Sequence, residues 1–338
     1  VVTINGNNTQ LDGLTIQDGY ANDSSTSGGG GIFMQQQGSL SVMHNVTLRQ
    51  CKLLNNFGNA CGAVYLSFAN NVTANRNLFF NCIFQNNSTL VNGGEVRIKG
   101  SLPSPATQSS FTQCIMERNT ATQGAGIYFE PSVIGNLFHC TFSRNKANVA
   151  GGAIHSSLVT NIRNSILYFD SVGSISNEIS NNGTINVFFS NLQGSGGSSN
   201  WNSAFGTDQG NNIDVNPQFL AGSLLEITPA SLCRNAGNKN FISEPFDIRG
   251  TTRVLQDTVD IGAYESNPVV YVAWDAPVGG NGQSWATAYN NLQDGLDNAG
   301  LSGYQKDVWI KAGTYKPTRA TNGTDGGRFN TFFVRASN

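Results

Sequence analysis

Four short segments decide the fold: CKLLNN at 51–56, CIFQNN at 82–87, CIMERN at 114–119 and CTFSRN at 140–145. Each copy has the form Cys-x-apolar-x-x-Asn, and successive copies lie 26 to 32 residues apart. Each copy is followed by a small-residue turn and a strand-like run, which read CGAVYL, GGEVRI, GAGIYF and GGAIHS. Self-similarity at such a period is typical of proteins built from stacked repeats.

The spacing within each copy predicts which side chains point into the stack. Side chains alternate along a strand, so the cysteine and the apolar residue two places later face the same way. Stacking then forms an interior column of cysteines: Cys51, Cys82, Cys114 and Cys140. A second column contains the asparagines that close each copy: Asn56, Asn87, Asn119 and Asn145. Asparagine tolerates the left-handed backbone of a tight corner, and stacked amides can hydrogen-bond along the column.

Degenerate copies flank this set. GLTIQDG at 13–19 has Leu14 at the cysteine position, and NSILYFD at 164–170 has Ser165 there and Asp170 at the asparagine position. The chain of 338 residues is 38% hydrophobic and 10% aromatic, with its apolar residues in short β-type runs between turns rich in Gly and Asn. We therefore predict an all-β fold, a right-handed parallel β-helix (solenoid), with a short capping α-helix in the C-terminal segment.

Charge and hydropathy exclude two classes of function. Only 12% of residues are charged, the formal net charge is −2, and no cluster of Lys and Arg is present, which argues against a nucleic-acid partner. No run of about 18 apolar residues occurs, so we predict no membrane-spanning segment.

Two families resemble parts of the chain. FSRN at 142–145 followed by GGAI at 151–154 resembles the paired FxxN and GGA[ILV] repeats of chlamydial polymorphic outer-membrane proteins. The later part is similar to the large right-handed β-helix surface proteins of Bacteroidetes-type bacteria. That second resemblance is carried by NSILYFD, NVFFSNLQGSGG, DVNPQF, TPASLCRNAG and VDIGAYE, where TPASLCRNAG departs from the usual SPAINAG. Both resemblances imply a β-helix that is extracellular or on the bacterial cell surface.

A change of pattern after IGAYES predicts a boundary. We assign residues 1–266 to the C-terminal part of one solenoid domain and 267–338 to the start of a following β-helix unit. The second unit should contain a strand, a helix at about 285–299 with Ser284 as N-cap, and strands in 307–315 and 330–336. The resemblance to Bacteroidetes-type surface proteins implies that this helix is a capping helix and that the strands belong to the first coils of a β-helix. Two arrangements stay open: tandem domains of a longer protein, or a second unit that packs on the first. An exposed last coil would be an open sheet edge that favours head-to-tail stacking of copies into a fibre.

The sequence offers little catalytic chemistry. The acids of the central coils, Glu95, Glu117 and Glu130, occupy different coil positions, whereas glycoside hydrolysis needs two carboxylates close together. We therefore predict no catalytic residues and no cofactor.

Metal binding is also weakly indicated. His44, His139 and His155 lack HxH or HxxxH spacing, so we expect them at the surface or in turns, with His139 facing outward. The cysteines form no CxxC pair and are interpreted as small buried hydrophobes, with disulfides between adjacent coils as the alternative; Cys61 and Cys233 lie outside the column.

One loop weakly suggests Ca²⁺. GTDQGNNID at 206–214 contains Asp208 and Asp214, but it lacks the acidic ligand series and the terminal Glu of a calcium loop. We interpret it as an ordinary loop rich in Asn and Gly.

These observations favour a non-catalytic structural or adhesive module at the cell surface, part of a larger protein or fibre. Its partners would be neighbouring copies of itself, head to tail, or surface glycans. The alternative is a β-helix that binds or cleaves polysaccharides, and a third hypothesis is a passenger domain like the chlamydial proteins. For glycan binding, the candidate stacking residues are the aromatics Tyr65, Phe68, Tyr128 and Phe129, although we expect most of them in the core.

Overall fold

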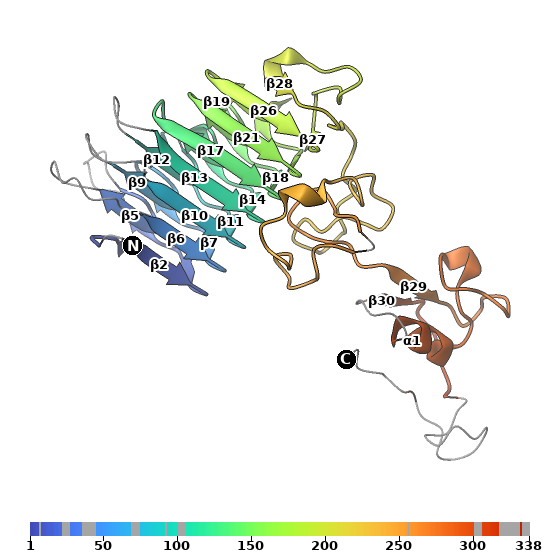
Figure 1. Ribbon diagram of the computed structural model, residues 1–338. Helices are drawn as coiled ribbons and strands as arrows, with labels where there is room; N and C mark the ends of the chain where they lie inside the picture. Colours follow the sequence, from blue (N-terminus) through green and yellow to red (C-terminus); the bar gives the residue numbers. More distant parts are fainter. Residues whose placement is uncertain are drawn as a thin grey trace. The chain divides into compact units, whose positions relative to one another are not determined.

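The first unit of the chain, Val1–Glu265, is a stack of β-strand coils (Figure 1). The structure is a computed structural model. It describes residues 1–6, 8–21, 28–35, 45–68, 75–91, 93–100, 106–255, 257–300, 306–317 and 332. Strands far apart in sequence pair side by side, and every pairing between the described strands is parallel except β23 with β24. The predicted all-β parallel β-helix with a short helix is confirmed.

Each coil contributes strands to successive faces, which we call sheets A to D. Sheet A contains β1 (Val2–Thr3), β5 (Ile32–Gln35), β9 (Val64–Ser67), β12 (Val96–Lys99), β16 (Ile127–Phe129), β20 (Ile154–Ser156) and β25 (Ile179–Asn181). Sheet B contains β2 (Thr9–Asp12), β6 (Val46–Arg49), β10 (Arg76–Phe80), β13 (Thr107–Thr112), β17 (Val133–Phe138), β21 (Val159–Arg163), β26 (Thr184–Phe188) and β28 (Thr207–Asp208).

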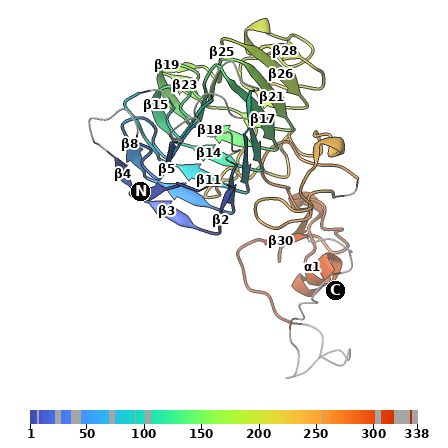
Figure 2. The ribbon, with the colours of Figure 1, turned by 60° about the vertical axis from the view of Figure 1, so that its left-hand side comes forward.

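Sheet C follows sheet B after a tight turn. It contains β3 (Thr15–Gln17), β7 (Lys52–Leu54), β11 (Ile83–Gln85), β14 (Ile115–Glu117), β18 (Thr141–Ser143), β22 (Ile166–Leu167) and β27 (Asn191–Leu192). The fourth face, sheet D, contains β4 (Tyr20–Ala21), β8 (Phe57–Gly58), β15 (Thr120–Gln123), β19 (Lys146–Ala150), β23 (Ser171–Val172) and β24 (Ile175–Ser176). Isolated bridges through Ser88 join β8 to β15. In Figure 2, β15 and β19 lie on the opposite side of the stack from β17 and β21.

The corners explain the variable length of the repeat. The connection from sheet A to sheet B spans residues 36–45 in an early coil but only 157–158 in a later one. The corner between sheets C and D instead keeps one geometry, with a left-handed residue just before the ladder asparagine: φ is 55° at Asn55, 56° at Asn86, 55° at Arg118 and 60° at Arg144. The prediction that the ladder asparagine itself is left-handed is therefore wrong. Its neighbour reverses the chain, which leaves the ladder side chain directed inward.

The interior is apolar and continuous along the stack. The column cysteines and the apolar residues two places later are fully buried in one cluster, together with Phe79, Phe111 and Phe129. The rings of Phe79 and Phe111 stack in parallel with centroids 4.2 Å apart. Burial of large apolar side chains is the dominant stabilising term of such a stack.

The last coil is covered by the chain that follows β27. This stretch includes a 3₁₀ turn, η1 (Ser203–Phe205), and its Trp201 and Phe205 pack against the interior cluster. Trp201 Nε1 also donates a hydrogen bond to the Gly206 carbonyl at 2.9 Å.

Residues 216–265, which we call the closing segment, return along the outer face of sheet C (Figure 1). They contain a second 3₁₀ turn, η2 (Lys239–Phe241). Ile115 packs against Leu225 and Ala263, and the Ala263 amide donates to Thr141 Oγ1 at 2.9 Å. Ile166 packs against Ile227, Cys233 and Ile261. The closing segment therefore builds a second apolar core outside the stack.

In the described residues of the second unit, Ser266–Asn338, the structure has a two-stranded parallel sheet and one helix. The strands are β29 (Val269–Val272) and β30 (Asp307–Ile310), and α1 spans Leu292–Gly300. The predicted helix start at 285 is wrong: Ser284 caps only a 3₁₀ turn, η3 (Trp285–Thr287). Tyr289 then bridges to Val272, which interrupts helical hydrogen bonding, and Asn291 caps α1 through the Gln293 amide. The strand predicted at 330–336 lies outside the described residues, apart from Phe332.

Candidate functional site

The structure brings the four predicted asparagines into one buried hydrogen-bonded column. Asn87 Oδ1 accepts from the backbone N–H and from Nδ2 of Asn56, both at 2.9 Å. Asn119 Oδ1 accepts in the same way from Asn87, and Asn145 Oδ1 from Asn119. Each side-chain amide also donates to a backbone carbonyl of the neighbouring coil, for example Asn119 Nδ2 to Phe84 at 3.2 Å. The column satisfies its own polar groups, so its role is structural.

The column ends in a pair of buried acids. Asp170 Oδ1 accepts from the N–H and from Nδ2 of Asn145, both at 2.7 Å. Burial raises the pKa of Asp170 to about 7, against the opposing effect of hydrogen bonds from Glu178 and Asn145. Glu178 is fully buried and occupies the coil position that Glu95 and Ala153 have in earlier coils.

The cysteine column is also interior. All six cysteines are free thiols and buried, and each column Sγ donates to backbone carbonyls, as Cys82 does to Phe80 at 3.3 Å. Serine continues the column: Ser165 Oγ accepts from the Cys140 amide at 3.0 Å, and Ser190 Oγ accepts from Ser165. Outside the column, burial raises the pKa of Cys61 to about 12 and that of Cys233 to about 11. These thiols are shielded side chains rather than reactive ones.

Two histidines are less exposed than the sequence predicts. His139 lies in the turn between β17 and β18, as expected, but the closing segment covers it, and it contacts Arg253 and Asn164. Burial and the Arg253 charge lower the pKa of His139. His155 is also buried, against Tyr128. His139 is buried because a solenoid position that faces outward can still be covered by chain from elsewhere, whereas His155 is packed among Tyr128, Ser157 and Ser180 around the same face of sheet A. His44 lies outside the described residues.

The two aspartates considered as Ca²⁺ ligands accept hydrogen bonds from residues of the turns around them. Asp208 Oδ1 accepts from Ser198 Oγ, the Gly210 amide and Asn212 Nδ2, at 2.6 to 2.9 Å. Asp214 Oδ2 accepts from the amides of Gly194 and Gly196, both at 3.0 Å. Among the described residues, no group of three or more His, Cys, Asp or Glu side chains is arranged to hold a metal ion.

Of the four aromatic residues considered for glycan binding, two lie in the interior of the stack and two on its outer surface. Phe68 and Phe129 belong to the interior cluster, as expected for most of these aromatics, so they cannot stack on a sugar. Tyr65 and Tyr128 instead lie on the outer face of sheet A on either side of Arg97, whose guanidinium is 5.6 and 5.7 Å from their ring centroids. Arg97 is also paired with Glu130 at 2.6 Å, and Tyr65 is only 6% exposed. Little of this column is open to a ligand.

The outer face of sheet B is more open, and it carries two neighbouring columns of polar and aromatic side chains. The first is a row of amides, in which Asn161 Nδ2 donates to Asn136 Oδ1 at 3.0 Å and Asn186 Nδ2 donates to Asn161 Oδ1 at 3.1 Å. The second, two residues further along each strand, places Arg163 between Phe138 and Phe188. All six side chains are half-buried. We call these six residues the sheet B strip; β17, β21 and β26, which carry it, lie side by side in Figure 1. The sequence shows the residues, but only the strand register brings them together.

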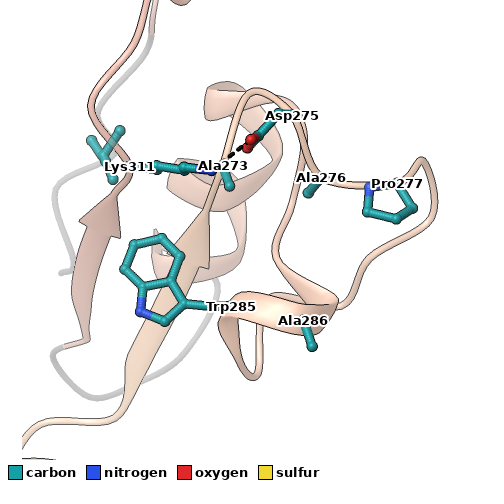
Figure 3. Close-up of a pocket in the computed structure, with 8 residues that line it drawn as sticks. Ala273, Asp275, Ala276, Pro277, Trp285, Ala286 and Lys311 are labelled. Carbon is teal, nitrogen blue, oxygen red and sulfur yellow. Dashed lines mark hydrogen bonds and ion pairs between the residues drawn. The ribbon is translucent and has the colours of Figure 1, made fainter.

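A separate pocket of about 550 Å³ lies in the second unit (Figure 3). Alanines, Pro277, Ile310 and the half-exposed Trp285 line it, and Lys311 Nζ pairs with Asp275 at 2.5 Å. Because these two charges neutralise each other, the pocket offers an apolar surface but no acid–base pair.

Comparison with known proteins gives one family match. Residues 139–157 match the model of the Chlamydia polymorphic membrane protein repeat. This stretch contains β18 and β19 and ends just after β20, so the matched repeat covers the strands of sheets C, D and A in one coil. No curated protein and no solved structure matches the chain. Among the described residues, no helix has the length and apolar character needed to cross a bilayer.

Proposed function

We propose that this chain is part of a bacterial cell-surface or extracellular protein, in which it acts as a non-catalytic structural and adhesive module. The observation that carries the proposal is the match of residues 139–157 to a repeat of chlamydial membrane proteins, within a stack whose other coils repeat the same hydrogen-bonding pattern. The resemblance to Bacteroidetes-type surface β-helix proteins points the same way.

The surroundings of the acids support a role without catalysis. Glu117 is paired with Arg144 at 2.8 Å and with Arg118, and Glu130 with Arg97. Glu95 is fully buried inside the stack. None of these three carboxylates has the exposed, closely spaced partner that glycoside hydrolysis requires.

Surface location is tested by treating intact cells of the encoding organism with proteinase K and probing with antibodies raised against this chain. We expect the antigen to be degraded while a cytoplasmic marker protein survives. Protection of the antigen until the cells are lysed would contradict the proposal.

Polysaccharide binding is the second candidate, and the sheet B strip is the observation that favours it.

Association of copies into a fibre is a further proposal. Within the described residues, Trp201 and Phe205 cover the last coil of the first unit, so that coil lacks the open sheet edge expected for head-to-tail stacking, and the fibre proposal rests on the repeat of the coils. Analytical ultracentrifugation over a range of concentrations tests it: growth of long species supports a fibre, and a constant monomer mass argues against it.

A further inference from the structure

The guanidinium of Arg163 is held among aromatic rings, and no acidic side chain of the described residues pairs with it. Its Cζ lies 4.8 Å from the ring centroid of Phe188, 5.3 Å from that of Phe138 and 5.5 Å from that of Phe241. Phe138 and Phe188 come from the strands on either side, and Phe241 comes from the closing segment. The negative faces of aromatic rings attract a cation, so the three rings fix the position of the charge.

Most other arginines of the described chain are already neutralised. Six of them have a carboxylate within 4.0 Å: Arg49, Arg97, Arg118, Arg144, Arg249 and Arg253. Arg163 has no ion pair and no side-chain hydrogen bond within the described residues, although burial is sufficient to lower its pKa. A half-desolvated guanidinium with free N–H donors gains more from an anion than a solvated one does, and its planar fork matches a carboxylate.

The amide row lies beside this charge on the same outward face. Asn161 precedes Arg163 by two residues, which separates their Cα atoms by about 7 Å along the strand. Asn136 and Asn186 flank Asn161 on the adjacent strands, and the three amides are oriented by hydrogen bonds to one another. An amide nitrogen has two N–H donors, so each of Asn161 and Asn186 keeps one donor for a ligand after forming its bond within the row.

We propose that the sheet B strip binds a carboxylate-bearing polysaccharide, a chain of uronic acid residues. Arg163 receives the carboxylate, the exposed parts of Phe138 and Phe188 contact sugar C–H groups, and the amide row hydrogen-bonds to hydroxyls. A repeating ligand fits because the row itself repeats at the strand spacing of about 4.8 Å. Since the groups are already fixed, little conformational entropy is lost on binding. This inference rests on polysaccharide binding, the second candidate function, and names its ligand class.

The test is isothermal titration of the full chain with an oligogalacturonate, compared with a neutral glucan oligomer of equal length. We expect binding of the uronate and none of the glucan. Arg163→Gln should weaken binding roughly tenfold or more, and Arg163→Lys should also weaken it because an ammonium lacks the planar fork. Asn161→Asp, which adds a negative charge beside the site, provides a second variant that lowers affinity.

The matched control is Arg76→Gln. Arg76 is an exposed arginine on the same outer face of sheet B, and it makes no ion pair or ring contact within the described residues. Its loss should leave the affinity unchanged, which separates the site from general positive charge. Circular dichroism establishes that each variant is folded.

Several results would overturn the proposal: no uronate binding by the wild-type chain, equal affinity for the neutral glucan, or Arg163→Gln and Asn161→Asp both at wild-type affinity. Stronger binding of polyglutamate or of a sulfated glycan would also overturn it, in favour of a different anion. Protease accessibility on intact cells is independent of these titrations, so surface location can hold while the ligand assignment fails, and the reverse.

Discussion

Asparagine at the ladder position links neighbouring coils, while the residue before it turns the chain. Asn119 joins three coils, since its Oδ1 accepts two hydrogen bonds from Asn87 and its Nδ2 donates to Phe84 and Asn145. Buried donors and acceptors that lose their partners cost about 1–3 kcal/mol each. The ladder therefore contributes a large share of the free energy that couples the folding of neighbouring coils.

We predict that Asn119→Ala lowers the free energy of unfolding by about 3 kcal/mol or more, because it leaves several buried polar groups without partners. Equilibrium denaturation with urea measures it. The control is Asn148→Ala, at an exposed position of β19, which should change stability by less than about 0.5 kcal/mol. Equal effects of the two substitutions would show that the ladder is not a major source of stability.

The end of the ladder gives a second prediction, at Asp170. Asp170→Asn keeps an oxygen acceptor for Asn145, so it should be tolerated, whereas Asp170→Ala removes that acceptor and should destabilise. The pKa of Asp170 is raised to about 7, above its unfolded value of about 3.9. Its contribution to stability is therefore full below about pH 4 and is lost as the pH rises toward 7. Thermal melts from pH 4 to 7.5 should show a smaller decline for Asp170→Asn than for the wild-type chain. Parallel curves would contradict this.

Glu95 gives a third prediction. Both of its carboxyl oxygens are buried without a hydrogen-bond partner, and burial raises its pKa well above the ordinary value. The folded state therefore keeps a proton that the unfolded state releases above about pH 4.3, so stability falls as the pH rises. Glu95→Gln should gain stability relative to wild type as the pH rises from 4 to 7, by up to about 1.4 kcal/mol per pH unit. Urea denaturation at several pH values measures it, and a pH-independent difference would refute it.

At the scale of elements, the strands could be predicted because alternation and repeat spacing are local properties. The aligned cysteines identify sheet C and its inward face directly. The closing segment could not be predicted in the same way. Ile115 and Ile166 point outward from sheet C, and nothing in the repeat shows that residues 216–265 return to cover them. The burial of His139 is missed for the same reason, since its neighbour Arg253 is distant in sequence.

Packing of the closing segment is tested at two glycines. Both have a left-handed backbone, with φ of 107° at Gly262 and 92° at Gly250. A Cβ at Gly262 would lie 2.8 Å from Ile166 Cδ1 and 3.0 Å from Thr141 Oγ1, whereas a Cβ at Gly250 meets nothing within 4 Å. Both alanine variants carry the backbone strain, but only Gly262→Ala adds a clash with sheet C. Limited proteolysis should cleave the closing segment faster in Gly262→Ala than in Gly250→Ala. Equal rates would show that the segment is not packed there.

The side chains of the candidate sites are brought together by contacts between residues that are distant in sequence. Tyr65 and Tyr128 can be proposed as stacking residues from their type alone, but whether they are accessible depends on the surrounding chain. Arg163 attracts no notice in the sequence, because its flanking rings lie 25 residues away on either side and further along in the closing segment. Strand register, which is set by the corners, brings them into contact.

At the scale of the whole molecule, the interior of the solenoid provides its stability, and its outer surface is available to bind a ligand. Its interior is closed by apolar columns and by the asparagine ladder, so outward side chains that the closing segment does not cover can vary without disturbing the stack. A surface that binds a long polymer without cutting it needs a regular row of contacts rather than an enclosed cleft. The sheet B strip has that form.

The most direct measurement is co-sedimentation of the chain with an insoluble polygalacturonate gel, with the supernatant assayed for new reducing ends and unsaturated products. We predict that the chain sediments with the gel, that Arg163→Gln sediments less, and that no products are released. Release of products would contradict the non-catalytic function, and a chain that stays in the supernatant would contradict the binding surface.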